Sequence, residues 1–369
     1  MNTTIPLLDL KREHGAIATE VAKAWEEALE SMHLLKGANT AAFEREIAEY
    51  IGVPHAIGTS SGTDALTLGL WALGIGPGDE VIVHANAFTA DVEAIRSTGA
   101  QPVLVDVEED GFGPDLEAVG RAVTARTRAL LVVHLYGSPL PLERLLDLVQ
   151  ARRLMLVEDA SHAPGAGRRG RRVGSFGAVG CFSAGVVKNL GAYGDAGFVT
   201  TADQEIAKRV RLYQTHGQER KNHHVLYGGN CRLDELQAAV LRIKLKYLDA
   251  RNQRRREIAA FYSSRFAPHG VSVPTEVPGE VHVYHQYVIR TPRRDALSSY
   301  LKGAGIETGI HYPVPLHRQP AWLRAYGEMP ALPRAERLAQ EILSLPVFPD
   351  LTDAEVERVA DAVVSFFRR

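Results

Sequence analysis

The sequence predicts an α/β protein with a large domain built on a mostly parallel sheet and a smaller C-terminal domain. Three observations support this. Short apolar runs alternate with amphipathic stretches over the first two-thirds of the 369 residues, as in successive βα units. The runs are apolar almost without interruption, which is typical of strands buried on both faces. After a long helical segment the alternation stops, which indicates a second structural unit.

The first two-thirds contain four expected strands and the helices between them. The strands fall at residues 80–85, 102–107, 129–137 and 154–160. Amphipathic stretches at residues 89–99 and 142–153 predict connecting helices.

The last third begins with the longest predicted helix. The expected elements are a helix at 233–266, a strand at 282–290, a helix at 294–305 with a glycine stop, and a closing helix at 353–367. We place the domain boundary inside the long helix, near residue 248. This gives a large domain of residues 1–248 and a small domain of residues 249–369.

Composition argues against several classes of protein. A net charge of −2 provides no general attraction to nucleic acid or to a membrane. The basic run at residues 168–172 is short, and Gly170 at its centre predicts a solvated hairpin. The apolar run at residues 5–10 is short and interrupted, so we expect no signal peptide, and no run approaches the ~20 residues of a membrane span.

The cysteines and histidines suggest no metal or disulfide framework. Cys181 and Cys231 are the two cysteines, and no CxxC pair is present, so a reducing cytoplasm is the expected location. His223 and His224 are adjacent but lack a third ligand at zinc-site spacing. We therefore expect no metal.

A turn rich in glycine and hydroxyl groups precedes a helical pattern at residues 58–70. Backbone N–H groups at a helix start bind phosphate well. The plainer interpretation is a capped helix start, with Ser61 or Thr63 as the cap and Asp64 in the first turn. The motif alone leaves both interpretations open.

Two residues further along are candidates for chemistry. Asp159 ends a predicted strand, where ligands bind in open α/β sheets, although an aspartate there can also brace a loop. Lys188 stands among small and apolar residues and is followed by three glycines. A desolvated lysine has a lowered pKa and can form a Schiff base, whereas a surface lysine would only snorkel to solvent.

Taken together, these motifs resemble the DegT/DnrJ/StrS family of sugar aminotransferases. This family belongs to the fold type I group of pyridoxal-phosphate (PLP) enzymes, in the aspartate aminotransferase superfamily. The resemblance covers nearly the whole chain. It is carried in order by IPLLDL, SSGTDAL, GIGPGDEVIV, HLYG, EDASHA, KNLGAYGDAG, NCRLDELQAAVL and GIHYPVPLHRQPAW. It implies a large domain with a seven-stranded, mostly parallel sheet between helices, and a small α+β domain.

The resemblance also implies a set of roles. Lys188 would hold the cofactor covalently and move a proton, while Asp159 would pair with the pyridine nitrogen. The other implied cofactor contacts are Gly62, Thr63 and Ser183 at the phosphate, Phe88 on the ring face, His162 where the family often has glutamine, and Asn230 from a second subunit. The Asn230 role implies a homodimer with shared active sites. Pro164, and Ala184 to Val187, also depart from the usual family pattern.

The implied reaction moves an amino group from L-glutamate to a keto group of a nucleotide-linked sugar. The HYPVPLH motif resembles that of members aminating C3 of a dTDP-3-keto-6-deoxyhexose, and His311, Tyr312 and His317 are the candidate sugar contacts. In the plainer interpretation, the prolines of this motif merely shape a loop. Alternative functions are amination of a 4-keto sugar or keto-cyclitol, or a non-catalytic regulator that binds the cofactor or a sugar nucleotide.

Overall fold

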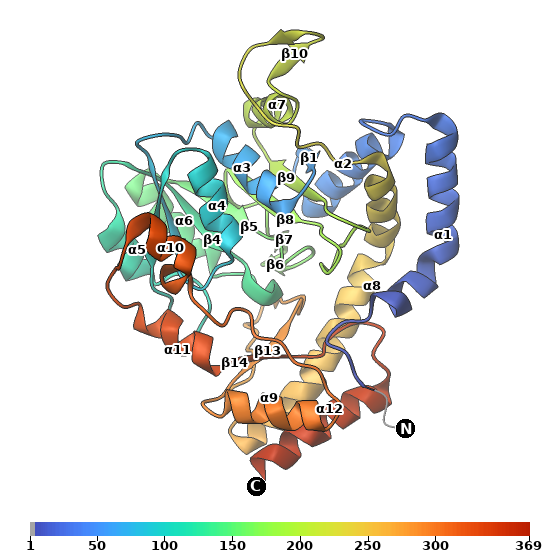
Figure 1. Ribbon diagram of the computed structural model, residues 1–369, viewed down its shortest axis with the longest axis vertical. Helices are drawn as coiled ribbons and strands as arrows, with labels where there is room; N and C mark the ends of the chain where they lie inside the picture. The colour runs from blue at the N-terminus through green and yellow to red at the C-terminus, as the bar shows by residue number, and fades with distance from the viewer. Residues whose placement is uncertain (1–3) are drawn as a thin grey trace.

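A central seven-stranded sheet organises the protein, whose computed structural model describes residues 4–369 (Figure 1). The spatial order is β1–β9–β8–β5–β4–β2–β3. The strands are β1 (His55–Thr59), β2 (Glu80–His84), β3 (Gln101–Val105), β4 (Thr127–Val133), β5 (Met155–Asp159), β8 (Val179–Ser183) and β9 (Gly197–Thr201). Only β9 runs antiparallel to its neighbours, so the predicted mostly parallel sheet is confirmed. Residues 1–3 of the predicted large domain lie outside the described residues.

The four predicted strands are present, and each ends one or more residues before its expected last residue. The strand expected at 129–137 ends at Val133, because residues Leu135–Gly137 form a single 3-10 turn. Strands β4 and β5 pair in parallel so that Val133 lies opposite Asp159. Asp159 in turn lies opposite Cys181 on β8. The sheet therefore presents Asp159 at its carboxyl edge, beside the end of β8.

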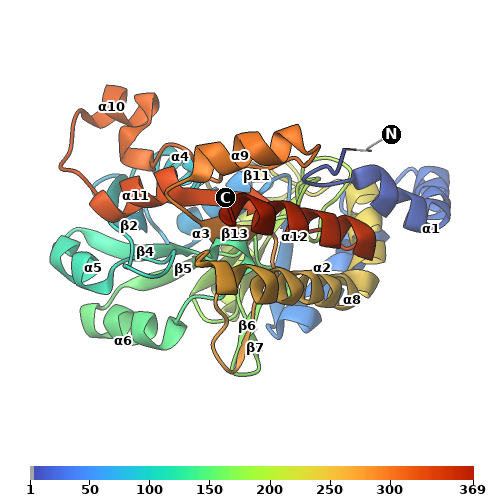
Figure 2. The same ribbon diagram turned by 90° about the horizontal axis from the view of Figure 1, so that it is seen from below.

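Helices cover both faces of the sheet. They are α1 (Leu10–Ser31), α2 (Ala38–Ile51), α3 (Gly62–Ala72), α4 (Thr89–Ser97), α5 (Leu116–Ala122), α6 (Leu142–Arg152) and α7 (Gln204–Tyr213). Figure 2 shows α4 and α6 on opposite sides of the central strands. Neighbouring residues of β2 divide between the two faces: Val81 and Val83 join one hydrophobic cluster, whereas Ile82 joins another. This alternation explains why the strands are apolar at every position.

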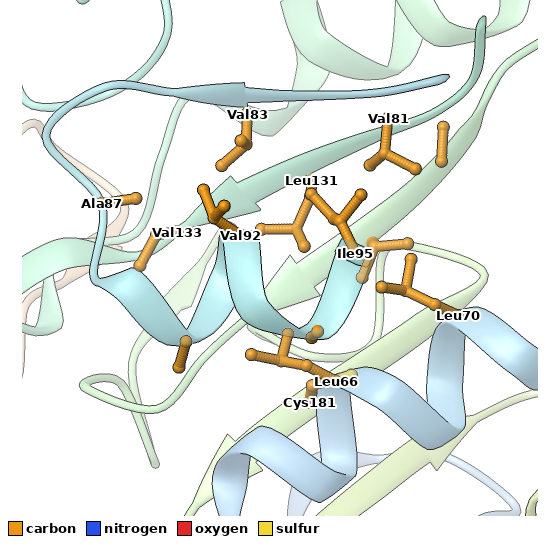
Figure 3. Close-up of a cluster of buried hydrophobic side chains, with 14 of the residues drawn as sticks. Leu66, Leu70, Val81, Val83, Ala87, Val92, Ile95, Leu131, Val133 and Cys181 are labelled. Carbon is orange, nitrogen blue, oxygen red and sulfur yellow. The ribbon is translucent and has the colours of Figure 1, made fainter. Parts of the chain in front are cut away.

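The packing of α3 and α4 on the sheet is apolar throughout (Figure 3). Val92 and Ile95 of α4 lie between Val83 and Leu131 of the sheet and Leu66 of α3. All five side chains are buried, which holds the N-termini of both helices at the carboxyl edge of the sheet. Burial of this kind contributes roughly 1.5–3 kcal/mol per large side chain.

The long predicted helix is present as α8 (Glu235–Phe266). Its first half contributes Leu241 and Leu248 to a cluster with α2, and its second half contributes Ile258 and Tyr262 to a cluster with the C-terminal elements. This change of partner supports the proposed boundary near residue 248, which stays a prediction. The C-terminal elements are β12 (Glu280–Val281), β13 (Tyr287–Arg290), α9 (Arg294–Gly303), α10 (Pro320–Tyr326), α11 (Pro333–Glu341), β14 (Ile342–Leu345) and α12 (Asp353–Phe367), with 3-10 turns at Ala267–His269 and Leu316–Arg318.

The prediction of a strand at 282–290 is wrong for residues 282–286. Strand β13 begins only at Tyr287, because Tyr284 adopts a left-handed backbone conformation with φ of 42°. The His282 ring stacks on Tyr284 at 3.8 Å between ring centroids, and His282 Nδ1 accepts a hydrogen bond from the Tyr284 N–H at 2.9 Å. The apolar and aromatic pattern of these residues therefore belongs to a tight turn.

Two hairpins extend from the main body. The basic run forms the predicted hairpin, with β6 (Gly167–Arg168) paired to β7 (Arg171–Arg172) around Gly170. Strands β10 (Gln218–Arg220) and β11 (His223–His224) form a second hairpin that projects from the top of the view in Figure 1. Within residues 4–369, no helix is both long enough and apolar enough to cross a membrane.

Candidate active site

Lys188 lies in a tight loop after β8. Its backbone N–H donates to the Gly185 carbonyl at 2.9 Å, and the Ala192 N–H donates to the Ala184 carbonyl at 2.8 Å. A Cβ atom at Gly191 would lie 2.8 Å from the Val186 carbonyl oxygen, closer than real Cβ contacts allow. Glycine at 191 thus allows the close backbone approach between the two ends of the loop, which fixes the position of Lys188.

The Lys188 amine is held among buried acids. Burial lowers its pKa to about 8, although attraction from Asp159 and Asp91 acts in the opposite direction. A larger fraction of neutral amine near pH 8 makes the side chain a usable nucleophile. The sequence-based interpretation of Lys188 as a desolvated lysine agrees with this environment.

Asp159 is the acid nearest the end of the sheet. It is 5% exposed, and its Oδ1 accepts a hydrogen bond from the Ser161 N–H at 2.9 Å. The Ser161 hydroxyl accepts from the Ser183 N–H at 3.0 Å, which joins the ends of β5 and β8. Asp159 is therefore fixed beside the loop that carries Lys188.

The start of α3 lies next to the end of β8. Ser61 is the cap, and its Oγ accepts from the Asp64 N–H at 3.0 Å, as one of the two sequence alternatives predicted. The N–H groups of Gly62 and Thr63 lie in the first turn, where a helix offers no internal acceptor. A Cβ atom on Gly62 would lie 2.5 Å from the Ser183 Cβ. The structure therefore brings Gly62, Thr63 and Ser183 together at a helix start, a geometry that suits an anion.

Two aromatic rings line the site. The Phe88 ring is 48% exposed, and its centroid lies 5.2 Å from that of Tyr312. Burial, together with the nearby acids Asp159 and Asp91, raises the pKa of Tyr312. Phe88 thus offers an exposed apolar face, and Tyr312 faces the same acids as Lys188.

Three histidines lie near Lys188 as neutral rings. Burial and the charge of Lys188 hold the pKa values of His162 and His285 well below their usual range, and the two rings are 4.4 Å apart. His162 Nδ1 accepts from the Tyr136 N–H at 3.2 Å. Burial, with Lys188 as a second cause, lowers the pKa of His311 to about 4, and its Nδ1 lies 2.8 Å from the Ser344 hydroxyl.

Two residues predicted for the site, His317 and Asn230, make their side-chain contacts with other groups. His317 is 0% exposed, and its Nε2 lies 2.8 Å from a Glu336 carboxylate oxygen on α11. Asn230 is exposed, and its Oδ1 accepts from Arg232 Nε at 2.8 Å. It stands one residue before Cys231, whose carbonyl accepts from the Ser60 N–H at 3.2 Å.

Sequence reasoning missed Asp91, His285 and Tyr136. Asp91 lies in the first turn of α4, where an acid is ordinary and gives no signal of burial. His285 lies within the segment expected to be a strand. Glu158, which precedes Asp159 on β5, is fully buried, and its carboxylate accepts from the N–H groups of Gly174, Phe176 and Gly177 at 2.7–2.8 Å.

Known proteins share this architecture over the full chain. The model of the DegT/DnrJ/EryC1/StrS aminotransferase family matches residues 16–364. A dTDP-3-amino-3,4,6-trideoxy-alpha-D-glucose transaminase of Streptomyces venezuelae is 45% identical over 99% of this chain and 97% of its own length. The crystal structure of S. venezuelae DesV in complex with a ketimine intermediate superposes with a TM-score of 0.97 at 45% identity, covering 100% of both chains. A Bacillus subtilis structure with the cofactor PMP bound has a TM-score of 0.95 at 29% identity, covering 100% of this chain and 86% of its own.

The residues present fit pyridoxal phosphate, the cofactor of such enzymes. The backbone at Gly62, where a Cβ atom would not fit, suits a phosphate, and the exposed ring of Phe88 suits a planar heterocycle. The Lys188 amine stands beside the buried acid Asp159. The chain belongs to the DegT/DnrJ/EryC1/StrS aminotransferase family and has the α/β fold of its PLP-dependent members.

Proposed function

We propose that this protein moves an amino group from L-glutamate to the C3 keto group of a dTDP-linked 3-keto-6-deoxyhexose. The observation that carries the proposal is the Lys188 amine, with its pKa lowered to about 8, beside the buried carboxyl of Asp159. The choice of C3 and of the dTDP carrier is supported by the S. venezuelae transaminase, whose name specifies a dTDP-3-amino sugar.

Lys188 and Asp159 would share the chemical work. When bound, pyridoxal phosphate supplies an electron-accepting ring and a carbonyl group that exchanges with amines. The neutral Lys188 Nζ would attach the cofactor and would then carry a proton as general base and acid in both halves of the reaction. Asp159, held by Ser161, would keep the pyridine nitrogen protonated.

The remaining cofactor contacts would orient the ring. Gly62 and Thr63 would donate backbone N–H groups to the phosphate, together with the Ser183 hydroxyl. Phe88 would cover one face of the cofactor ring. His162, as a neutral imidazole, would hydrogen-bond the hydroxyl group of that ring.

His311 and Tyr312 are the residues we assign to the sugar. Burial and the charge of Lys188 lower the pKa of His311, and burial and the nearby acids Asp159 and Asp91 raise the pKa of Tyr312. These influences support an assignment of both residues to the reacting end of the site. His317 has no exposed surface and pairs with Glu336, which supports a role in holding the loop around it.

A homodimer with shared sites would complete the cofactor pocket. The β10–β11 hairpin and the residues after it carry two exposed apolar side chains, Tyr227 (100% exposed) and Val225 (50%). Such side chains on a projecting segment favour an interface with another chain. Asn230 follows in the same segment, so a second copy could bring it to its partner's phosphate. Light scattering tests this: we expect twice the 40.3 kDa of one chain, and a monomeric mass would contradict it.

We also propose a cytoplasmic location. Both cysteines are free, with Cys181 buried, which is typical of proteins in a reducing compartment.

The absorbance spectrum of the purified protein, before and after L-glutamate, tests the first half of the reaction. We expect a yellow cofactor band that bleaches with glutamate in the wild type and is missing in Lys188→Ala. The acceptor is then tested with matched 3-keto and 4-keto dTDP-sugars and a keto-inositol, with the 3-keto sugar expected to turn over. A spectrum that stays unchanged with every amino donor would favour the non-catalytic alternative.

A further inference from the structure

Asp91 is an acid buried beside the proposed site without a role in the chemistry described above. It lies in the first turn of α4 and is 0% exposed. Neither of its carboxyl oxygens has a hydrogen-bond partner among the residues that the structure describes. A buried, ionised and unpaired carboxylate is very unfavourable, so the group needs a partner or a proton.

The neighbour of Asp91 is Asp159. After burial, Asp159 is the group that acts most strongly on the Asp91 carboxyl, through its charge and its side chain, and the Phe88 backbone amide and the Lys188 amine act on the same carboxyl. Asp159 already accepts from the Ser161 N–H through Oδ1. Two adjacent buried carboxyls resist double ionisation, and a single shared proton both neutralises one charge and forms a hydrogen bond.

We propose that Asp91 is a positioning residue for Asp159: as a neutral acid it donates its proton to the Asp159 carboxylate and so fixes that carboxylate, with one negative charge for the pair, toward the pyridine nitrogen. The orientation toward the pyridine nitrogen rests on the proposed function, whereas the shared proton depends only on the chain. Burial and the neighbouring charge of Asp159 both raise the pKa of Asp91, which agrees with a protonated acid.

Other charged and titratable groups face the pair from the surrounding elements. Lys188 in the loop after β8 attracts both acids, Cys181 lies on β8, and Tyr312 lies in the C-terminal loop. Burial and the nearby acids raise the pKa values of Cys181 and Tyr312, so both are neutral donors at neutral pH. Lys188 is therefore the one cation among these named neighbours, and it favours a pair with a single negative charge.

The first test uses the protein without cofactor. The free energy of unfolding is measured by denaturant titration from pH 5 to pH 9 for the wild type and for Asp91→Asn. A carboxyl with a raised pKa in the folded state stabilises the protein at low pH, and that contribution is lost as pH rises. We therefore expect the free energy of unfolding of Asp91→Asn, minus that of the wild type, to increase with pH. The slope should approach the value for one bound proton.

Asp203→Asn is the matched control, because it changes the exposed cap of α7 and asparagine caps helices as well as aspartate. A stability difference for Asp91→Asn that does not vary with pH would overturn the shared proton.

The second test measures the dissociation constant of pyridoxal phosphate. Asp91→Asn keeps a hydrogen-bond donor to Asp159 and should bind within about threefold of wild type, whereas Asp91→Ala should bind about tenfold more weakly, the size of one hydrogen bond to a charged group. Equal weakening in both variants would overturn the positioning role. If the wild type itself bound no cofactor, the proposed function would fail while the pH experiment would still decide the state of Asp91.

Discussion

Gly62 at the start of α3 lies so close to Ser183 at the end of β8 that a Cβ atom on Gly62 would stand 2.5 Å from the Ser183 Cβ. This contact places a helix N-terminus against the strand that leads to Lys188. It joins the phosphate end of the proposed site to its reactive end.

Substitution of Gly62 by alanine should therefore weaken cofactor binding. The new methyl group must displace Ser183 or tilt α3, and we expect the dissociation constant of pyridoxal phosphate to rise at least about tenfold, as for loss of a charge-assisted hydrogen bond. Gly120→Ala is the matched control, since Gly120 lies in α5 with nothing within 4 Å of a new Cβ. That variant should bind normally and gain up to ~1 kcal/mol of stability. Normal binding by Gly62→Ala would contradict the proposed phosphate cradle.

Capture of pyridoxal phosphate by the cofactor-free protein should depend on pH through Lys188. Because only the neutral amine attacks, the rate constant should rise about tenfold per pH unit below the pKa of about 8 and level off above it. Stopped-flow absorbance from pH 6 to pH 9.5 measures this, with Lys188→Ala as the blank. A rate still rising steeply near pH 9.5 would mean that Lys188 is not desolvated as described.

The loop residues Tyr312 and His317 should separate by phenotype. Tyr312→Phe removes a hydroxyl near the acids, so we expect a change in KM or kcat for the sugar with little loss of stability. His317→Ala removes a fully buried ring and its bond to Glu336, and should lower the free energy of unfolding by about 2–4 kcal/mol. Steady-state kinetics beside denaturant unfolding distinguishes the two. A stable His317→Ala with a raised sugar KM would instead favour the sugar contact expected from the sequence motif.

The Glu235 carboxylate should stabilise the protein at neutral pH. It is buried and accepts hydrogen bonds from the Thr40 N–H at 3.0 Å and the Thr40 hydroxyl at 2.7 Å, which joins α8 to the start of α2. Burial alone would raise its pKa, but these bonds and those from the backbone of residues 37–40 outweigh it and lower the pKa.

A lowered pKa means that the stabilisation is present above the unfolded pKa and is lost as the pH falls through the folded one. Glu235→Ala should cost about 2–4 kcal/mol at pH 7, and the deficit should shrink below about pH 4. A deficit that stays constant between pH 7 and pH 3 would contradict this account. Chemical denaturation across that range measures it.

The sequence by itself determined the layers of the fold and pointed to most residues of the proposed site. Its apolar runs needed burial on both faces, so an alternating βα pattern could satisfy them only as a parallel sheet between helices. The helix at Asp353–Phe367 was predicted to the residue, because a capping box and an amphipathic period are local signals. Lys188, Asp159 and Gly62 stood out because a lysine among small residues, an acid at a strand end and a glycine at a helix start are unusual locally.

Only the tertiary structure decided which acids and rings share the site with Lys188. Asp91 is ordinary in the first turn of a helix, and it becomes unusual only because α4 docks that turn beside Asp159. His285 lay in an apparent strand, yet the left-handed Tyr284 turns the chain and brings its ring to 4.4 Å from His162. His317 lies in the same HYPVPLH motif as His311, but the packing of α11 buries His317 against Glu336. Periodicity reports local geometry, whereas these contacts depend on how distant elements pack, which no local pattern encodes.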